Sequence, residues 1–537
     1  MYECPNCSAN LKYNISKQAL FCDHCNTTLE PYSFHKEFDA EENTSFGVTI
    51  FTCPQCGGEL MTDDSTAATF CSFCGSSTIL DSRVSMEKRP DYIIPFSLDE
   101  EACKKSYKKM IRRAIFAPKE LSDPEHIQKF RGIYMPYWVY SFGRRGQVTF
   151  DGQRTKRKGD YIHTKHYDID CEVDMEYNDL AYDASSTFYD SLSDAIAPFS
   201  IEQGKPFHPA FLSGFYADTS DIDERLYKEE AQNIALGDAI RQIRKKPIFA
   251  SYTPPTDASL KSALYFPQTK ESLGLFPVWF LSYKKEDRIV YAVINGQNGR
   301  VAADLPVDKK KYLLGSALLT VPIFTLLNML FTIKPTILLW ISLLLSLFCI
   351  FLTNKQMKHI IEKETFAKDK GVLGKPGTDT FLPEEYYNEL QEKPDSASAL
   401  KTKLIAIWKL LPTWLWLIIL LSAGNLLLIG YNILIPLIVL SIPYILLQRT
   451  ISKPKHNKSF LETLKRILPY IKYPLISILL SIGILLWNPV YDTFYYIGVI
   501  VCMLMTALTF TDLIELHNRL TTRKLPQLNK RGGDENA

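Results

Sequence analysis

The position of the charge-free apolar runs constrains this chain most, because every long run of this kind lies after residue 311. The longest has 38 uncharged residues. As one helix it would measure about 57 Å against a hydrocarbon core of about 30 Å, so it must hold two spans. Two further pairs of runs are each divided by a short turn that contains proline. The sequence therefore predicts six membrane helices in three hairpins, at 312–353, 410–447 and 473–511.

The average composition conceals this division of the chain. With 46% hydrophobic residues and a mean hydropathy of −0.07, the whole resembles an ordinary soluble protein, yet the first 310 residues are polar. The two parts are therefore expected in different solvents. The shortest predicted span, Ile433 to Leu447, holds Pro436 and Pro443, so both a full crossing and a re-entrant hairpin are consistent with its sequence.

Basic residues in the predicted loops indicate the orientation, since lysine and arginine in short loops mark the cytoplasmic side. The segments 354–409, 448–472 and 512–537 hold ten, seven and five basic residues, whereas the opposite loops hold only Lys334. We therefore expect a multi-pass protein of the plasma membrane with both termini in the cytoplasm. The first residues lack the basic start and apolar run of a secretory signal, which agrees with a cytoplasmic head.

Eight of the twelve cysteines lie within the first 74 residues, in four Cys-x-x-Cys pairs. In both units 14 residues separate the pairs, and the units repeat with a period of 49 residues. This spacing is typical of a tetrahedral site with four thiolates, and a reducing cytosol favours metal binding over disulfides. We expect two zinc ribbons with one structural Zn²⁺ each, bound by Cys4, Cys7, Cys22 and Cys25 in the first and by Cys53, Cys56, Cys71 and Cys74 in the second.

The residue after each Cys-x-x-Cys pair is expected to have a positive φ angle. Gly57 and Gly75 suit this conformation and Asn26 tolerates it, whereas Ser8 departs from the pattern. His24 lies inside a pair, and we expect an exposed side chain there because four thiolates already close the site. A zinc site closed by four protein ligands stabilises the fold and has no open position for water, so hydrolysis by zinc is not expected.

The charge of the cysteine-rich region bears on its partner. Residues 1–82 contain three basic and eleven acidic residues, a net charge of −8 before the thiolates are counted. Binding to nucleic acid requires clustered lysine and arginine that neutralise phosphates. The sequence therefore argues against a nucleic-acid partner and favours a cytoplasmic protein.

Residues 91–306 alternate strand-like aromatic segments with amphipathic helices, which indicates a soluble α+β domain. We interpret its two recurring phrases as an internal duplication. In this duplication Trp138 and Trp279 are equivalent, and buried core positions are favoured for them over an exposed binding platform. The phrases are IIPFSL at 93–98, which returns as IAPFSI at 196–201, and MPYWVYSF at 135–142, which returns as FPVWFLSY at 276–283.

One concentrated group of basic residues lies in the head, between Arg144 and Lys158. Attraction to anionic lipid, at about 1 kcal/mol per basic residue close to the membrane, is one interpretation. A solvated hairpin is the other. The basic residues are Arg144, Arg145, Arg154, Lys156, Arg157 and Lys158.

The resulting fold class is a multi-domain protein with two small β zinc ribbons, an α+β soluble domain with an internal duplication, and an α-helical membrane domain of six spans. The expected segments are ribbon 1 (1–30), a linker (31–50), ribbon 2 (51–82), the duplicated domain (91–306), three membrane hairpins (312–353, 410–447, 473–511), two cytoplasmic loops (354–409, 448–472) and a cytoplasmic tail (512–537).

Motifs of catalysis are missing from the sequence. The phrase GVLGKPGTD lacks the spacing of a phosphate-binding loop, and Pro376 stands where Ser or Thr should hold magnesium. G-x-S-x-G and H-E-x-x-H are also absent. We therefore expect no enzyme, but a membrane-anchored adaptor or sensor for a protein partner. The alternative is a channel, lipid-handling or small-molecule transport protein gated by the zinc head, and a helicase-related protein is least favoured.

The paired ribbons, the IIPFSL and YMPYW phrases and NGQNGRVAADLP together resemble bacterial membrane-associated proteins described as containing a transcription-factor-IIB-type zinc ribbon. The resemblance covers residues 1 to about 310. It implies metal binding by the eight cysteines and no catalytic residues. Such proteins are sometimes labelled relatives of the primosomal helicase, but that likeness ends at the cysteines because no helicase motor motif is present.

Overall fold

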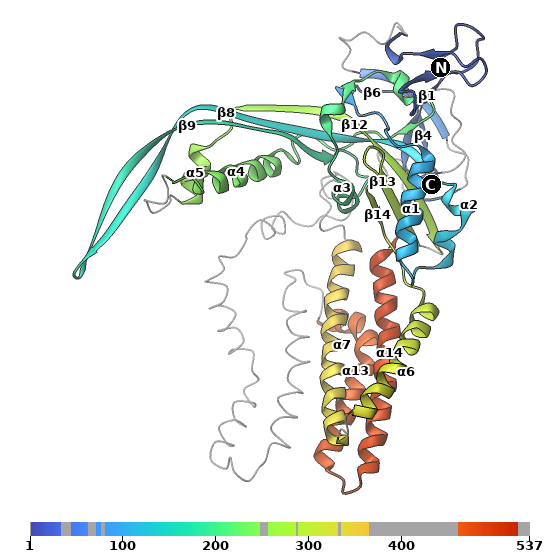
Figure 1. The fold of residues 1–537 in the computed structure, drawn as a ribbon, viewed down its shortest axis with the longest axis vertical. Coiled ribbons are helices and arrows are strands. Elements are labelled where there is room, and N and C mark those ends of the chain that lie inside the picture. The colour runs from blue at the N-terminus through green and yellow to red at the C-terminus, as the bar shows by residue number, and fades with distance from the viewer. Residues whose placement is uncertain are drawn as a thin grey trace.

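In a computed structural model, the protein has a β-rich head at one end and a group of long helices at the other (Figure 1). A two-stranded ribbon projects sideways from the head. The structure describes residues 2–33, 45–62, 71–76, 81–247, 256–285, 288–330, 334–364 and 460–524.

A twelve-stranded sheet organises the described part of the head. Its central pair is β8 (Arg131–Lys158) and β12 (Gln268–Lys285), which run antiparallel over thirteen registered residue pairs. A separate three-stranded sheet carries the first cysteine unit. The remaining strands are β1 (Lys12–Asn14), β2 (Ala19–Phe21), β3 (Thr28–Leu29), β4 (Ser45–Thr52), β5 (Glu59–Thr62), β6 (Asp81–Lys88), β7 (Tyr92–Ile93), β9 (Tyr161–Asp183), β10 (Lys205–Pro206), β11 (Tyr216–Ala217), β13 (Arg288–Asn295), β14 (Val301–Ala303) and β15 (Arg523–Lys524).

The register of β8 against β12 relates the two recurring phrases. Met135 pairs with Phe276, and these are the first residues of the two copies of the P-x-W phrase. An antiparallel pair in which equivalent residues face each other has a local two-fold axis at that point. Each long strand also continues into a neighbouring antiparallel strand, β9 or β13. The duplication itself stays a prediction, and this register is the one that a duplication would produce.

Helices cover the sheet and form its core with it. In α1 (Glu100–Arg113), Asp99 caps the first turn by accepting a hydrogen bond from Ala102 N, and the residues at 103, 107 and 111 are buried at helical spacing. The other short elements of the head are α2 (Pro124–Ile127), α3 (Asp190–Ile196), α4 (Lys228–Arg244), α5 (Asp257–Ala263) and the 3₁₀ turns η1 (Pro31–Ser33), η2 (Lys119–Ser122), η3 (Ile201–Gln203) and η4 (Pro209–Leu212).

The projecting ribbon is formed by the second half of β8 and the first half of β9. Near the head its side chains Val148 and Phe150 are buried with α4 and α5. Beyond Gly152 every side chain of both strands is exposed up to His166, and Gly159 takes a positive φ at the turn. The outer half of the ribbon therefore contributes no buried surface to the head.

Three long helices, α7 (Pro335–Glu364), α13 (Phe460–Trp487) and α14 (Asp492–Thr521), pack on one another, and α6 (Lys309–Leu330) lies beside them. The buried hydroxyl of Ser346 in α7 donates to Ser477 of α13 at 2.8 Å. Large apolar side chains such as Phe348 and Leu504 face outward. Such an apolar outer surface is expected for helices surrounded by lipid.

The prediction of six spans is wrong. Among the described residues, three helical segments are long and apolar enough to cross a membrane: Pro335–Ile361, Leu468–Trp487 and Asp492–Thr521. The predicted hairpin at 410–447 lies outside the described residues. Helix α6 is not one of the three, and it carries lysines in its first turn and Pro322 in its interior. An apolar run in the sequence reports composition only, whereas a span also requires that the run folds as a long apolar helix.

The predicted fold class also misses how the second cysteine unit is built into the head. Its strands β4, β5 and β6 belong to the same twelve-stranded sheet as β8 and β12, so this unit is not a separate small ribbon. The strand β11 joins the two parts by pairing with β5 on one side and with β8 on the other. Strand pairing between distant segments leaves no local trace in sequence.

Candidate metal centres

The first cysteine group lies at the edge of the small three-stranded sheet. Its four sulfur atoms converge from two knuckles, with Cys4 Sγ 3.4 Å from Cys25 Sγ and Cys7 Sγ 3.5 Å from Cys22 Sγ. Cys4 and Cys22 are buried, whereas Cys7 and Cys25 are partly exposed.

The second cysteine group lies inside the head and all four of its side chains are buried. Cys53 Sγ is 3.7 Å from Cys74 Sγ, and Cys56 Sγ is 3.7 Å from Cys71 Sγ. The surrounding core includes Phe73, Phe280 and Tyr291.

Both groups fit a tetrahedral metal ion. In each, the four ligand atoms lie within 4.8 Å of one another. A zinc–sulfur bond of about 2.3 Å in tetrahedral geometry separates sulfur atoms by about 3.8 Å, close to the distances in the second group. The structure thus brings together the eight cysteines that the sequence nominates, and four thiolates per group are the usual ligands of structural zinc.

The four knuckles share one backbone geometry. The residue after each pair donates its amide hydrogen to the carbonyl of the first cysteine, as Gly57 does to Cys53 at 2.8 Å. All four of these residues have positive φ angles, between 55° and 69°. The expectation is confirmed, and Ser8 adopts the same conformation in spite of its side chain. The residues are Ser8, Asn26, Gly57 and Gly75.

In each group, hydrogen bonds favour the thiolate form of at least one cysteine. The Thr27 hydroxyl lies 3.0 Å from Cys25 Sγ and lowers the pKa of that thiol to about 6. Hydrogen bonding with Cys56 lowers the pKa of the Cys53 thiol. His24 is exposed and is not part of the ligand cluster, as expected.

Comparison with known proteins gives one informative relative. Over 316 residues the chain is 30% identical to the uncharacterized protein YdjG of Bacillus subtilis strain 168, and the match covers 58% of this chain and 91% of YdjG. The chain belongs to the YdjG family. No family model matches, and no solved structure is similar. The finer expectation of a transcription-factor-IIB-type family is therefore left as a prediction.

A chain of contacts, which the sequence did not reveal, connects the second cysteine group of this YdjG-family protein to helix α14. The hydroxyl of Tyr291 donates to the carbonyl of Phe73, between Cys71 and Cys74, at 2.8 Å. The ring of Tyr291 lies 5.9 Å from that of Tyr189, and the guanidinium of Arg523 lies 3.8 Å above the ring of Tyr189. Arg523 lies two residues after the end of α14. Only the folded sheet brings these residues together.

The tryptophans of the two recurring P-x-W phrases are core residues and do not form an exposed binding platform. Trp138 and Trp279 are 4% and 5% exposed, and their indole nitrogens donate to the carbonyls of Ile222 and Leu98. The prediction of buried tryptophans is confirmed.

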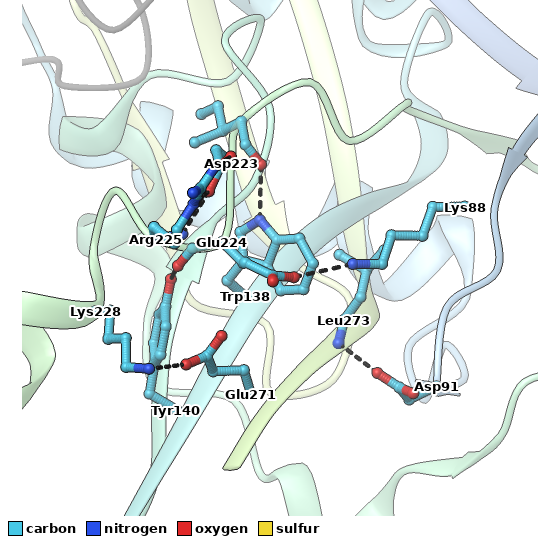
Figure 2. Close-up of polar contacts among 11 residues, drawn as sticks. Lys88, Asp91, Trp138, Tyr140, Asp223, Glu224, Arg225, Lys228, Glu271 and Leu273 are labelled. Atoms are coloured by element: carbon cyan, nitrogen blue, oxygen red, sulfur yellow. Dashed lines mark hydrogen bonds and ion pairs between the residues drawn. The ribbon is translucent and has the colours of Figure 1, made fainter. Parts of the chain in front are cut away.

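Charged residues around Trp138 are paired with one another (Figure 2). Lys88 lies 4.4 Å from the centre of the Trp138 ring and forms an ion pair with Glu224 at 3.0 Å. Lys228 pairs with Glu271 at 2.6 Å. These contacts join β6 to β8 and to the segment before α4, and they join α4 to β12, so we assign this polar cluster a structural role.

The basic residues between Arg144 and Lys158 lie along the projecting ribbon. Arg144 donates to the carbonyl of Tyr265, and Arg145 forms an ion pair with Asp174 at 2.8 Å, so both are engaged near the head. The others lie toward the turn, on exposed positions of β8: Arg154, Lys156, Arg157 and Lys158.

Proposed function

We propose that the protein is a membrane-anchored adaptor or sensor whose cytoplasmic, zinc-binding head holds a protein partner at the membrane. The contact chain from the second cysteine group through Tyr291, Tyr189 and Arg523 to the end of α14 carries this proposal. A metal ion in a closed site with four thiolates stabilises the fold around it. Through these contacts, the fold around the second site stabilises the end of a candidate membrane helix, and that helix end stabilises the fold around the site.

The head and the end of α14 lie on one side of the candidate membrane region. Strand β15, immediately after α14, pairs with β13 of the central sheet, and Arg288 of β13 donates to the carbonyls of Arg519 and Thr522. With the basic loops on the same side, this arrangement supports a cytoplasmic head at the plasma membrane.

The partner is expected to present a basic protein surface. The net charge of −8 over residues 1–82 attracts lysine- and arginine-rich surfaces and repels nucleic acid. Each site, with four buried or half-buried thiolates, leaves no position for a substrate, which supports binding over catalysis.

The ribbon supplies a second contact with the membrane in this proposal. Figure 1 shows it bending toward the level at which α7 and α14 meet the head. Its turn exposes Tyr161 and Ile162 beside basic residues such as Arg157 and Lys158. Exposed aromatic and aliphatic side chains flanked by basic residues suit an anionic membrane surface.

A pull-down of the intact protein from its own membranes in mild detergent tests the adaptor role. A variant with Cys53→Ser and Cys56→Ser would be compared with one carrying Cys4→Ser and Cys7→Ser, after insertion of both has been verified. We expect a protein that co-purifies with the wild type and is lost from at least one variant. Identical preparations from all three, each without a partner, would refute the adaptor role.

A further inference from the structure

The junction between the head and the membrane helices contains an open cavity of about 820 Å³. Its walls come from α3, from β14, and from the ends of α7 and α14 that face the head, which lie next to one another in Figure 1. We call this space the junction cavity. Its volume is within the range of sites that hold small molecules.

Most of the cavity wall is apolar. Side chains from the head and from α14 line it, among them Met110, Leu192, Ala195, Val301 and Leu520. An apolar wall beside the end of a candidate span suits an amphiphile, because the apolar part of such a ligand leaves water on binding.

Two cationic side chains face this wall, Lys363 at the end of α7 and Arg523 after α14. Arg523 is only 8% exposed, and its Nε atom has no hydrogen-bond partner. Asp304 is the acidic group between them, 3.5 Å from Lys363 Nζ and 3.5 Å from Arg523 Nε. Both separations exceed hydrogen-bond length, so one carboxylate is shared loosely by two cations.

The surroundings add positive charge to this corner of the cavity. Arg288 contacts the same end of α14. Burial lowers the pKa of Lys363 to about 8; the Asp304 carboxylate raises this pKa, and the charges of Arg523 and Arg288 lower it. His359 and Asp190 also line the cavity, and Asp190 accepts a hydrogen bond from Tyr227 at 3.1 Å. Lys363 Nζ donates to the carbonyl of Leu520 at 2.5 Å, and Arg523 donates to the Ser191 hydroxyl at 3.1 Å. Both acceptors are neutral, so an anion placed beside Lys363 and Arg523 would supply a closer charged partner than Asp304.

We propose that the junction cavity binds the phosphate headgroup of an anionic membrane lipid, held by Lys363 and Arg523, with its apolar part against the cavity wall. Soluble phosphate esters share this headgroup chemistry but lack the apolar part. The position at the ends of candidate spans and the apolar walls favour the lipid. The proposal does not depend on the adaptor role, since the cavity is described without reference to any protein partner.

Native mass spectrometry of the full-length protein in detergent tests the proposal, with phosphatidylglycerol, phosphatidylcholine and glycerol 3-phosphate as probes. We expect the wild type to prefer phosphatidylglycerol. Lys363→Gln should weaken this binding about tenfold, the usual effect of losing one charged hydrogen-bond donor. Ala195 on α3 lines the cavity and its side chain is exposed. Ala195→Leu should therefore narrow the cavity and weaken lipid binding without unfolding the protein.

Lys310→Gln is the matched control, because Lys310 is exposed at the start of α6 and does not line the cavity. It removes the same charge near the same membrane level and should leave lipid binding unchanged. Equal binding of phosphatidylglycerol to the wild type, Lys363→Gln and Ala195→Leu would overturn the proposal. Equally tight binding of glycerol 3-phosphate would overturn the lipid assignment and indicate a soluble phosphate ester.

Discussion

At the scale of single residues, the two cysteine groups differ in how much of the fold depends on them. The first group sits on a three-stranded sheet with two of its thiols partly exposed, whereas the second is buried in the core of the large sheet. Loss of one ligand in a buried site leaves polar sulfur atoms without a partner inside apolar surroundings. The second site should therefore matter more for stability.

Cys53→Ser and Cys4→Ser should each reduce bound zinc from two ions to one per chain, as measured by elemental mass spectrometry. We expect Cys53→Ser to destabilise the head by about 3 kcal/mol more than Cys4→Ser, which corresponds to a lower melting temperature by about 6 to 12 °C. Equal melting temperatures for the two variants would contradict a special role of the second site in the core.

His126 gives the head a dependence on pH. Burial lowers its pKa to about 4, its Nε2 atom has no hydrogen-bond partner, and its ring packs against Tyr283. The unfolded chain, with a histidine pKa of about 6.5, therefore takes up the proton first as pH falls. The stability contributed by neutral His126 is complete above about pH 6.5 and is lost between pH 6.5 and pH 4.

We expect His126→Leu to reduce the loss of stability between pH 7 and pH 5 by about 1 to 2 kcal/mol, measured from denaturant unfolding at both pH values. His163→Leu, at an exposed position on the ribbon, is the control and should keep the wild-type dependence. Any effect of acid on the zinc sites is common to both variants, so parallel pH profiles for all three proteins would exclude His126 as the cause.

At the scale of elements, the ribbon separates into two parts with different roles. Its inner part buries Val148, Phe150, Ile169 and Val173 against α4 and α5, while the outer part is exposed on both strands. A long, paired and solvated ribbon adds little to the stability of the head, since exposed hairpins bury too little apolar surface. A role for the outer part of the ribbon is therefore expected in a contact between its turn and another surface, such as the membrane.

Replacement of residues 153–166 by a two-residue turn should therefore leave the melting temperature of the head within about 2 °C of the wild type. The same deletion should remove the protection from hydrogen exchange that anionic nanodiscs confer on the remaining ribbon, compared with zwitterionic nanodiscs. A large fall in melting temperature would show that the outer ribbon supports the head in a way that its exposure does not suggest.

At the scale of the whole molecule, the sequence predicts the features that depend on residues close together in the chain and misses those that depend on distant residues. The metal ligands and the positive φ angles follow from spacing within a few residues, and both could be read directly. The burial of Trp138 and Trp279 was also predictable from their chemistry. The membership of β4, β5 and β6 in the large sheet was not, because strand partners are chosen by the folded chain.

The number of membrane spans was also predicted wrongly, and the contacts at the end of the membrane region were missed. Six apolar runs suggested six spans, but in the part of the chain that the structure describes three helical segments are long and apolar enough. The residues that join the second cysteine group to α14 lie far apart in sequence: Tyr291 bonds to Phe73, and β15 pairs with β13, across more than 200 positions. Such contacts cannot be predicted from a local sequence pattern.

These contacts allow a test of whether the metal site and the membrane helix are linked. Tyr291→Phe removes only the hydroxyl that bonds to Phe73, so both zinc ions should stay bound. The loss of one buried hydrogen bond costs about 1 kcal/mol, so amide exchange at residues 518–524 should become about fivefold faster. Cys53→Ser with Cys56→Ser should accelerate it further, and Cys4→Ser with Cys7→Ser should leave it unchanged. If all variants protected residues 518–524 equally, the second metal site and α14 would be independent, and the head would serve as an adaptor without a sensing role.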